Sequence, residues 1–239
     1  MRAREAPRPR WRTIADTLSA EIGAGKWKPG DRLPGEYALA DRFDVNRHTL
    51  RQAVSHLENE GLLRAEQGRG IFVPDPPIHY AVTPRTRYSD NIGQAQRRPS
   101  RQLLKAAEVP ADAVTGAALQ VPIETPLIWL ETLSLADERP VGIVSHYFPQ
   151  ARVPDIAEAF RTERSITAAL RKCGVADYKR RTTRISAQLI SNADARLLGV
   201  RRGRAVLVTD SINVEPDGRP IDFGYGRMLG ELMTFVVEF

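Results

Sequence analysis

The sequence predicts an α+β protein with two domains: a small helical domain that ends in a two-stranded ribbon, and a larger domain of antiparallel strands and short helices. Apolar residues recur with helical spacing over about the first sixty positions, whereas strand-like runs joined by short polar turns dominate the second half. Between these regions lies Pro-Asp-Pro-Pro (74–77), and proline stiffens a chain and ends regular structure. We therefore expect a basic flexible arm (1–10), a first domain (11–74), a linker (75–84) and a second domain (85–239).

The composition narrows the class of protein. Of 239 residues, 42% are hydrophobic and 27% charged, which is typical of a soluble globular protein. The single cysteine, Cys173, cannot form an internal disulfide and fits a reducing cytoplasm. The longest apolar stretches, such as 127–130 and 235–237, are too short to cross a bilayer, and the arginine-rich start lacks the apolar run of a secretory signal. We expect a cytoplasmic protein and exclude membrane, secreted, fibrous and disordered classes.

Positive charge is concentrated in the first part of the chain. The net charge is +6, and segment 76–105 alone carries 6 basic residues against 1 acidic residue. Segment 1–75 carries 13 against 11, whereas segment 106–239 carries 16 against 17. This asymmetry favours an anionic partner for the N-terminal part, and nucleic acid is the usual one.

Three short helices are expected in the first domain. Apolar residues recur every fourth position from Ile14, which predicts a helix over about 11–24, and a shorter helix is expected over about 35–43. Asn46 is well suited to cap a third helix, which runs to about Asn59.

Two short strands, over 62–66 and 70–73, follow the helices and are joined through Gln67, Gly68 and Arg69. Helices of these lengths followed by such a ribbon predict a winged helix-turn-helix. The tip of the ribbon can place a cation in the minor groove of DNA.

The third helix has a surface suited to DNA. Its first turn exposes Arg47, His48 and Thr49, and Arg51 follows one turn later. No acidic residue occurs between Arg47 and Leu57 that could repel phosphate. Arginine can bridge the O6 and N7 acceptors of guanine in the major groove, whereas the histidine and the threonine suit phosphate oxygens.

The second domain is predicted to consist mostly of hairpins. Strands are expected over 127–135, 140–147, 180–190, 205–214, 220–226 and 232–238. Short helices are expected over about 155–161, 165–173 and 192–198, with Ser165 and Asn192 as caps.

The first domain resembles the DNA-binding domain of the GntR family of bacterial transcription regulators. The residues that carry the resemblance are Leu33-Pro34-Gly35-Glu36, Leu39-Ala40-Asp41-Arg42-Phe43, Val45-Asn46-Arg47-His48-Thr49-Leu50-Arg51 and Gly68-Arg69-Gly70-Ile71-Phe72-Val73. The resemblance implies DNA contacts from Asn46, Arg47, His48, Thr49, Arg51, Gln67, Gly68 and Arg69. Tyr37 occupies a position where family members often carry a DNA-contacting arginine.

Residues 80–237 resemble the effector-binding (UTRA) domain of the HutC subfamily, which has a chorismate-lyase-like fold. The segments 133–149 and 220–238 carry this likeness. Within the subfamily, Thr86-Arg87-Tyr88-Ser89-Asp90-Asn91 and the 43–51 segment are most similar to phosphonate-utilisation regulators of the PhnF type. The resemblance implies a homodimer that binds a palindromic double-stranded operator.

Candidate effector contacts follow from residue chemistry and from this resemblance. Arg87, Tyr88, Ser89 and Asn91 offer a guanidinium, hydroxyls and an amide near a possible helix start at Ser89. Arg184, in mid-strand, needs an anionic partner if it is buried, and that partner is either a ligand or an acid of the sheet. Arg180 and Arg181 are expected to face solvent. The remaining candidates are Thr132, Ser134, His146, Asp222 and Tyr225.

Two of these candidates bear on the effector class. At Thr132 and Ser134, many subfamily members carry arginines that hold a sugar phosphate, so their absence argues against an amino-sugar phosphate. We therefore expect a small anionic effector, a phosphonate or a phosphate-bearing metabolite, that releases a repressor from its operator and controls phosphonate uptake or degradation. A sugar phosphate and a histidine-degradation intermediate remain alternatives.

An enzyme on the lyase-like fold is a distant alternative. Cys173 is expected to pack at a helix end, and the sequence has no Ser-His-Asp motif. His48 and His56 lie two helical turns apart and cannot share a metal ion. We therefore expect no catalytic residues, no metal and no cofactor.

Overall fold

The structure is a computed structural model that describes residues 9–66 and 68–238. Two compact units make up the chain, and the boundary between them falls between Pro76 and Pro77. Within the described residues, no helix combines the length and the apolar character needed to span a membrane.

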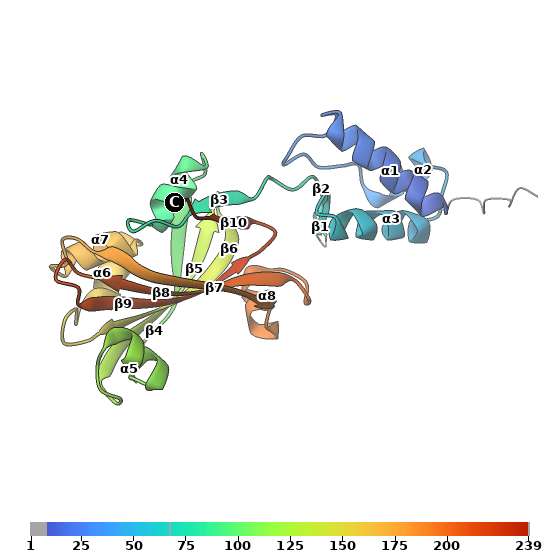
Figure 1. Cartoon of the computed structure of the whole chain (residues 1–239). Helices are drawn as coiled ribbons and strands as arrows, with labels where there is room; N and C mark the ends of the chain where they lie inside the picture. Colours follow the sequence, from blue (N-terminus) through green and yellow to red (C-terminus); the bar gives the residue numbers. More distant parts are fainter. Residues whose placement is uncertain (1–8, 67, 239) are drawn as a thin grey trace, which may run out of the picture. The chain divides into compact units, whose positions relative to one another are not determined.

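The first unit consists of three helices and a two-stranded antiparallel ribbon (Figure 1): α1 (Arg10–Gly23), α2 (Glu36–Arg42), α3 (Arg47–Asn59), β1 (Arg64–Glu66) and β2 (Gly70–Phe72). Leu18, Leu39 and Leu50 are fully buried where the helices meet. The predicted arm overlaps α1 by one position, because Arg10 is the first residue of that helix. Of the other arm residues, only Pro9 is described.

The second unit is built around a six-stranded antiparallel sheet with the strand order β4-β5-β6-β9-β8-β7. The strands are β4 (Pro99–Pro110), β5 (Pro126–Ala136), β6 (Arg139–Pro149), β7 (Lys179–Leu189), β8 (Ala205–Val214) and β9 (Pro220–Leu229). The α+β class is therefore confirmed. The sequence analysis did not predict β4, one of the two edge strands.

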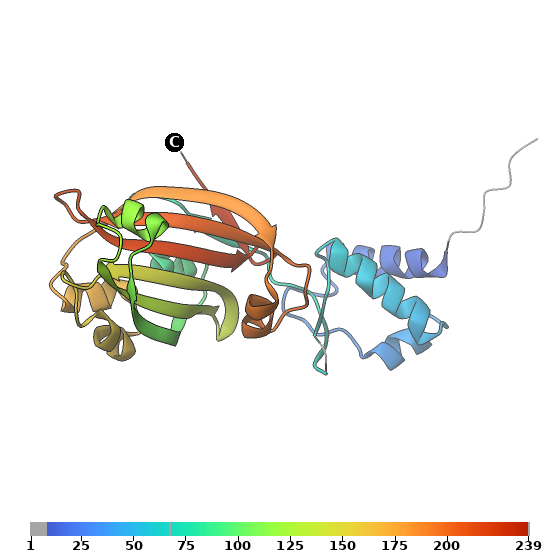
Figure 2. The same cartoon turned by 90° about the horizontal axis from the view of Figure 1, so that it is seen from below.

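One face of this sheet, here called the inner face, is covered by α4 (Tyr88–Gln94), α6 (Ile156–Glu163), α7 (Ile166–Lys172) and a separate pair of strands. The pair consists of β3 (Ile78–Ala81) and β10 (Met233–Val236), which run parallel, beside a main sheet that is antiparallel as predicted. The opposite, outer face packs against α5 (Ala113–Leu119) towards one end and α8 (Asn192–Leu198) towards the other (Figure 2).

The helix caps of the second unit follow local sequence chemistry. The Ser165 side chain accepts a hydrogen bond from the Ala168 amide and caps α7, as predicted. At α8 the prediction was one residue late: Ser191, not Asn192, accepts from the backbone, at the amide of Asp194. Serine and asparagine are both good caps, so composition alone does not decide between neighbours.

Candidate functional site

The start of α3 forms the first candidate site. The Asn46 side chain accepts hydrogen bonds from the Thr49 amide (2.9 Å) and the Thr49 hydroxyl (3.1 Å), which confirms the predicted cap. Arg47, His48 and Arg51 are exposed, outside the buried apolar stripe of the helix, and His48 lies opposite that stripe. The cap thus fixes the first helical turn, from which these cations project.

The first two residues of α2 hold the two arginines of α3. Arg47 donates from Nη1 to the Tyr37 hydroxyl (2.6 Å), and its Cζ lies 4.5 Å from the centre of the Tyr37 ring. Arg51 donates from Nε to both carboxylate oxygens of Glu36, at 3.1 and 2.9 Å, and these hydrogen bonds raise the pKa of Arg51. Tyr37 is 73% exposed, so it acts on Arg47 at the surface and does not pack in the core.

The ribbon tip presents one further cation. The Arg69 side chain is 77% exposed, and its Nη1 lies 2.8 Å from Glu66 Oε2. Gly68 has a positive φ of 76° and Gly70 one of 123°. A Cβ on Gly70 would lie 2.7 Å from Arg32 Nε, so this position needs glycine on two grounds. Gln67 lies outside the described residues.

The second candidate site is a cavity of about 390 Å³ on the inner face of the sheet. Arg87, Tyr88 and Ser89 line it from the start of α4, and Arg101 lines it from the edge strand β4. Further lining residues come from β3, β6–β9 and the segment around α7: Tyr80, His146, Thr167, Tyr178, Arg180, Asn213 and Asp222. Four arginines, the fourth being Arg164, and two carboxylates, Glu163 and Asp222, therefore line one cavity.

A chain of hydrogen bonds crosses the floor of the cavity from one edge strand to the other. Arg101 Nη1 lies 3.1 Å from His146 Nε2, and His146 Nδ1 lies 3.0 Å from Asp222 Oδ1. Asn213 donates to Asp222 Oδ2 (2.7 Å) and accepts from Arg180 Nε (2.8 Å). A guanidinium can only donate, so His146 Nε2 accepts and its Nδ1 carries the proton. The donors at both ends thus point inward to one carboxylate, Asp222, which is completely buried.

The third cavity arginine is held from the side. Arg87 lies with its Cζ 3.6 Å from the centre of the Tyr178 ring and donates to the carbonyl oxygens of Tyr178 and Thr86. Tyr88 donates its hydroxyl to Leu135 O (2.7 Å), while its ring lies 4.6 Å from Arg101 Cζ. Burial raises the pKa of Tyr88, so this hydroxyl remains a donor.

Segments of both units match families of known proteins. Residues 11–73 match the model of the bacterial regulatory proteins of the gntR family, and residues 94–234 match the UTRA domain model. A transcriptional regulator of the helix-turn-helix type from Rhizobium meliloti is 37% identical over 95% of this chain and 94% of its own length. The chain belongs to the GntR family.

Relatives and solved structures agree on the class of regulator. The probable transcriptional regulator PhnF of Escherichia coli is 26% identical over 96% of this chain and 95% of its own. The crystal structure of PhnF from Mycobacterium smegmatis superposes with a TM-score of 0.65 at 25% identity, covering 95% of this chain and 98% of that one. This GntR-family protein is a transcriptional regulator of the HutC class, and regulators of the family bind DNA operators.

The regulator's cavity brings together five of the ten predicted effector contacts: Arg87, Tyr88, Ser89, His146 and Asp222. Three others lie behind the lining. Thr132 and Ser134 are completely buried, and the Thr132 hydroxyl donates to Val144 O and lies 3.4 Å from Arg101 Nη1. Asn91 accepts from the Ala81 amide and donates to Arg87 O, so it fixes backbone around the cavity.

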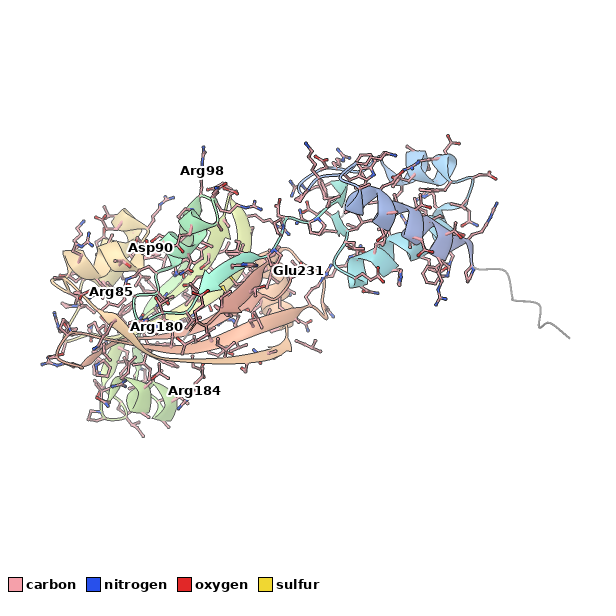
Figure 3. The ribbon with its side chains drawn as sticks, turned by 45° about the horizontal axis from the view of Figure 1, so that its top comes forward. Arg85, Asp90, Arg98, Arg180, Arg184 and Glu231 are labelled. Carbon is pink, nitrogen blue, oxygen red and sulfur yellow. The ribbon has the colours of Figure 1, made fainter. Side chains whose placement is uncertain are left out.

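Arg184 and Tyr225 do not line the cavity, because both lie on the outer face of the regulator's sheet. A β-bulge between Arg180 and Thr182 places Arg180 opposite Asn213, on the inner face, and Arg184 opposite Asp210, on the outer face. Figure 3 shows Arg180 on the same side of the sheet as Arg85, and Arg184 on the other side. Arg184 is exposed, so it needs no buried anion. Arg180, expected to face solvent, lines the cavity instead.

Arg101, Tyr80 and Tyr178 line the regulator's cavity but were missed by the sequence analysis. The clearest signal for Arg101 was its place in 76–105, the segment with the largest excess of positive charge.

Two further features of the described residues concern possible metal ligands and Cys173. No group of three or more His, Cys, Asp or Glu residues that could hold a metal ion occurs among residues 9–66 and 68–238. Burial raises the pKa of the Cys173 thiol, which disfavours the thiolate. Cys173 is the C-cap of α7 and packs against the cluster beneath α6 and α7, as expected for a structural residue.

Proposed function

We propose that the protein is a sequence-specific repressor that leaves its operator when a small anion binds the inner-face cavity. The observation that carries this proposal is the charge of the cavity. Four arginines line it, including Arg164, against two carboxylates. Glu163 lies 3.5 Å from Lys172 Nζ, and the buried carboxylate of Asp222 already accepts from His146 and Asn213. With both oxygens of Asp222 occupied, the cavity favours an anion over an amine.

On the DNA side, we propose that α3 enters the major groove. Arg47 and Arg51 contact guanine edges there, while His48 and Thr49 contact phosphates. Asn46 fixes the first turn, Tyr37 and Glu36 orient the arginines, and Gly68 and Arg69, with Gln67, approach the adjacent minor groove. The protein acts as a homodimer on a two-fold operator, because one winged domain contacts only a half-site.

For the effector, we propose a phosphonate or a phosphate-bearing metabolite, linked to phosphonate uptake or degradation. The support is the cavity's charge together with the similarity to regulators named PhnF. Carboxylates are the second candidate class, because relatives also include a mannosyl-D-glycerate system repressor and a histidine utilization repressor. We further propose a cytoplasmic, non-enzymatic protein divided into arm 1–10, DNA-binding domain 11–74, linker 75–84 and effector domain 85–239.

The DNA side is tested first. The full-length protein selects an operator from a library of random duplexes, and fluorescence anisotropy measures its affinity. Arg47→Ala and Arg51→Ala each weaken operator binding by about 1–3 kcal/mol and relax the preference at particular base pairs. A monomer on an asymmetric site, or unchanged base preference in both variants, contradicts the proposed DNA contacts.

The effector side uses the same assay with added methylphosphonate, glycerol 3-phosphate, urocanate or uncharged glycerol. A saturating effector weakens operator binding by about 5–150-fold. Arg101→Gln raises the concentration needed at least several-fold, whereas Arg184→Gln, the same change on the outer face, leaves it unaltered. Equal effects of the two variants, or release by glycerol alone, contradict the anion cavity.

A further inference from the structure

Tyr80 is a cavity residue whose hydroxyl the protein itself does not use. It lies in β3, is 9% exposed, and lines the cavity. Its ring packs edge-on against Phe235 of β10, with the ring centres 5.3 Å apart. This packing explains why an aromatic ring is present, and phenylalanine would satisfy it equally well.

The hydroxyl groups of the three tyrosines that line the cavity differ. Tyr88 donates to Leu135 O (2.7 Å), and the Tyr178 hydroxyl lies 2.7 Å from the Thr167 hydroxyl. Tyr80, by contrast, makes no hydrogen bond to any residue in 9–66 or 68–238. The Tyr80 oxygen is not one of the fully buried side-chain atoms that lack a partner, so the hydroxyl reaches the cavity and is available to a ligand that enters it.

The surroundings of Tyr80 define the chemistry of that partner. Burial raises the pKa of Tyr80, although the positive charges of Arg180, Arg101 and Arg87 act to lower it. The hydroxyl therefore stays protonated near neutral pH and can donate. The three arginines line the same cavity as Tyr80, so a partner that accepts from Tyr80 there shares the cavity with guanidinium groups. An oxyanion fits both requirements.

We propose that Tyr80 donates its hydroxyl hydrogen bond to an oxygen of the anionic effector and thereby links occupancy of the cavity to strand β3. This inference rests on the proposed function of the cavity. It adds a ligand contact and names the element through which the ligand acts. The shared ligand chemistry is an oxyanion head group, and phosphate, phosphonate and carboxylate each supply one.

The position of β3 in the chain connects the Tyr80–ligand hydrogen bond to the segment that joins the two units. Pro77 is the first residue of the second unit, and β3 begins at the next residue, Ile78. The Ile78 amide donates to Leu232 O (2.8 Å), and the Ala81 amide donates to Asn91 Oδ1 (2.6 Å). β3 is therefore held at both ends, and a ligand bond to Tyr80 adds a restraint three residues after the proline-rich segment. The ligand thus acts directly on the chain that joins the two units.

The test compares two matched substitutions in the full chain, Tyr80→Phe and Tyr225→Phe. Each removes one hydroxyl and keeps the ring, but Tyr225 lies on the outer face, where its hydroxyl is 3.4 Å from Gln188 Nε2. The probes are inorganic phosphate, methylphosphonate and acetate, titrated at constant ionic strength against KCl while the thermal midpoint is recorded. Operator affinity is measured with and without each probe.

We expect phosphate or methylphosphonate to stabilise the wild type and Tyr225→Phe alike, with dissociation constants within about twofold. Tyr80→Phe folds but binds the same probe about tenfold or more weakly, as expected for a lost hydrogen bond to a charged group. At saturating probe it also releases the operator less completely than the wild type does.

Three outcomes overturn the inference in different ways. Equal probe binding by Tyr80→Phe and the wild type, with both stabilised, overturns the role of Tyr80 and leaves the anion cavity intact. No stabilisation of the wild type by any of the three anions overturns the anion cavity and the inference together. Complete operator release by saturated Tyr80→Phe overturns the link through β3.

Discussion

Asp222→Asn probes the hydrogen-bond chain on the cavity floor, because it keeps the shape of the side chain while it replaces one oxygen with an NH₂ group and removes the negative charge. If the new NH₂ faces His146, the imidazole must move its proton to Nε2, where it meets a donor of Arg101. If the NH₂ faces Asn213, that amide must rotate and present its own NH₂ to Arg180. Every arrangement leaves two donors facing each other, since both ends of the chain are guanidinium groups that cannot accept.

The cost follows from burial. Asp222 is completely buried, and both hydrogen bonds it accepts, at 3.0 and 2.7 Å, join groups that have little access to water. A hydrogen bond to a charged group contributes about 1.5–3 kcal/mol, and a buried donor left unpaired costs about 1–3 kcal/mol. We expect the free energy of unfolding of the second unit to fall by about 2–4 kcal/mol. For a unit of this size, each kcal/mol lowers the thermal midpoint by about 2–4 °C.

The assay is urea unfolding of the full chain at pH 7, followed by the circular dichroism of the sheet. Asp210→Asn serves as the control, because Asp210 is half-buried on the outer face of the same sheet. It should change the free energy of unfolding by less than about 0.5 kcal/mol, as is usual for surface substitutions. A loss below 0.5 kcal/mol in Asp222→Asn would refute the argument, since it would mean that the proton directions along the chain are not fixed.

Two further predictions concern the first unit. Hydrogen bonds from Arg42 and Lys26 lower the pKa of Glu21 from 4.5 to about 2. Because the pKa of Glu21 is lower in the folded state, this stabilisation is present above about pH 4.5 and is lost as the pH falls towards 2. Glu21→Gln should therefore lower the free energy of unfolding by about 1–2 kcal/mol at pH 7. In urea melts near pH 2, the variant and the wild type should not differ. Glu36→Gln frees Arg51 and removes a negative charge near the DNA phosphates. Fluorescence anisotropy should therefore show two- to fivefold tighter binding to scrambled DNA, about 0.3–1 kcal/mol, and a smaller preference for the operator. An unchanged preference for the operator would contradict the orienting role of Glu36.

The first unit was predictable because its signals are local. The cap at Asn46 satisfies the amide only three positions later, and the buried leucines recur with the helical period. Each signal needs only a few consecutive residues, so the sequence alone predicts the three helices to within two residues. The same locality explains the error at α8, where two adjacent residues are both good caps.

The strand β4 was missed because a β-bulge interrupts its alternation. The register shifts between Leu103 and Lys105, so an extra residue enters the strand and the apolar positions no longer alternate. The helix α5 could also have been predicted from the sequence, because Asp112 and Thr115 form a reciprocal capping box at its start. Before residue 126, the sequence pattern therefore predicts fewer strand residues than the structure contains.

The same kind of irregularity decides which cations enter the cavity. Residues four apart in a regular strand share a face, so Arg101 and Lys105 would lie together, as would Arg180 and Arg184. One bulge in each edge strand separates each pair: Arg101 and Arg180 point to the inner face, while Lys105 and Arg184 lie on the outer face. Each edge strand therefore supplies one guanidinium to the cavity and one cation to the opposite surface. Composition predicts that the edge strands are positively charged, but only the register of the bulges predicts which face of the sheet each cation lies on.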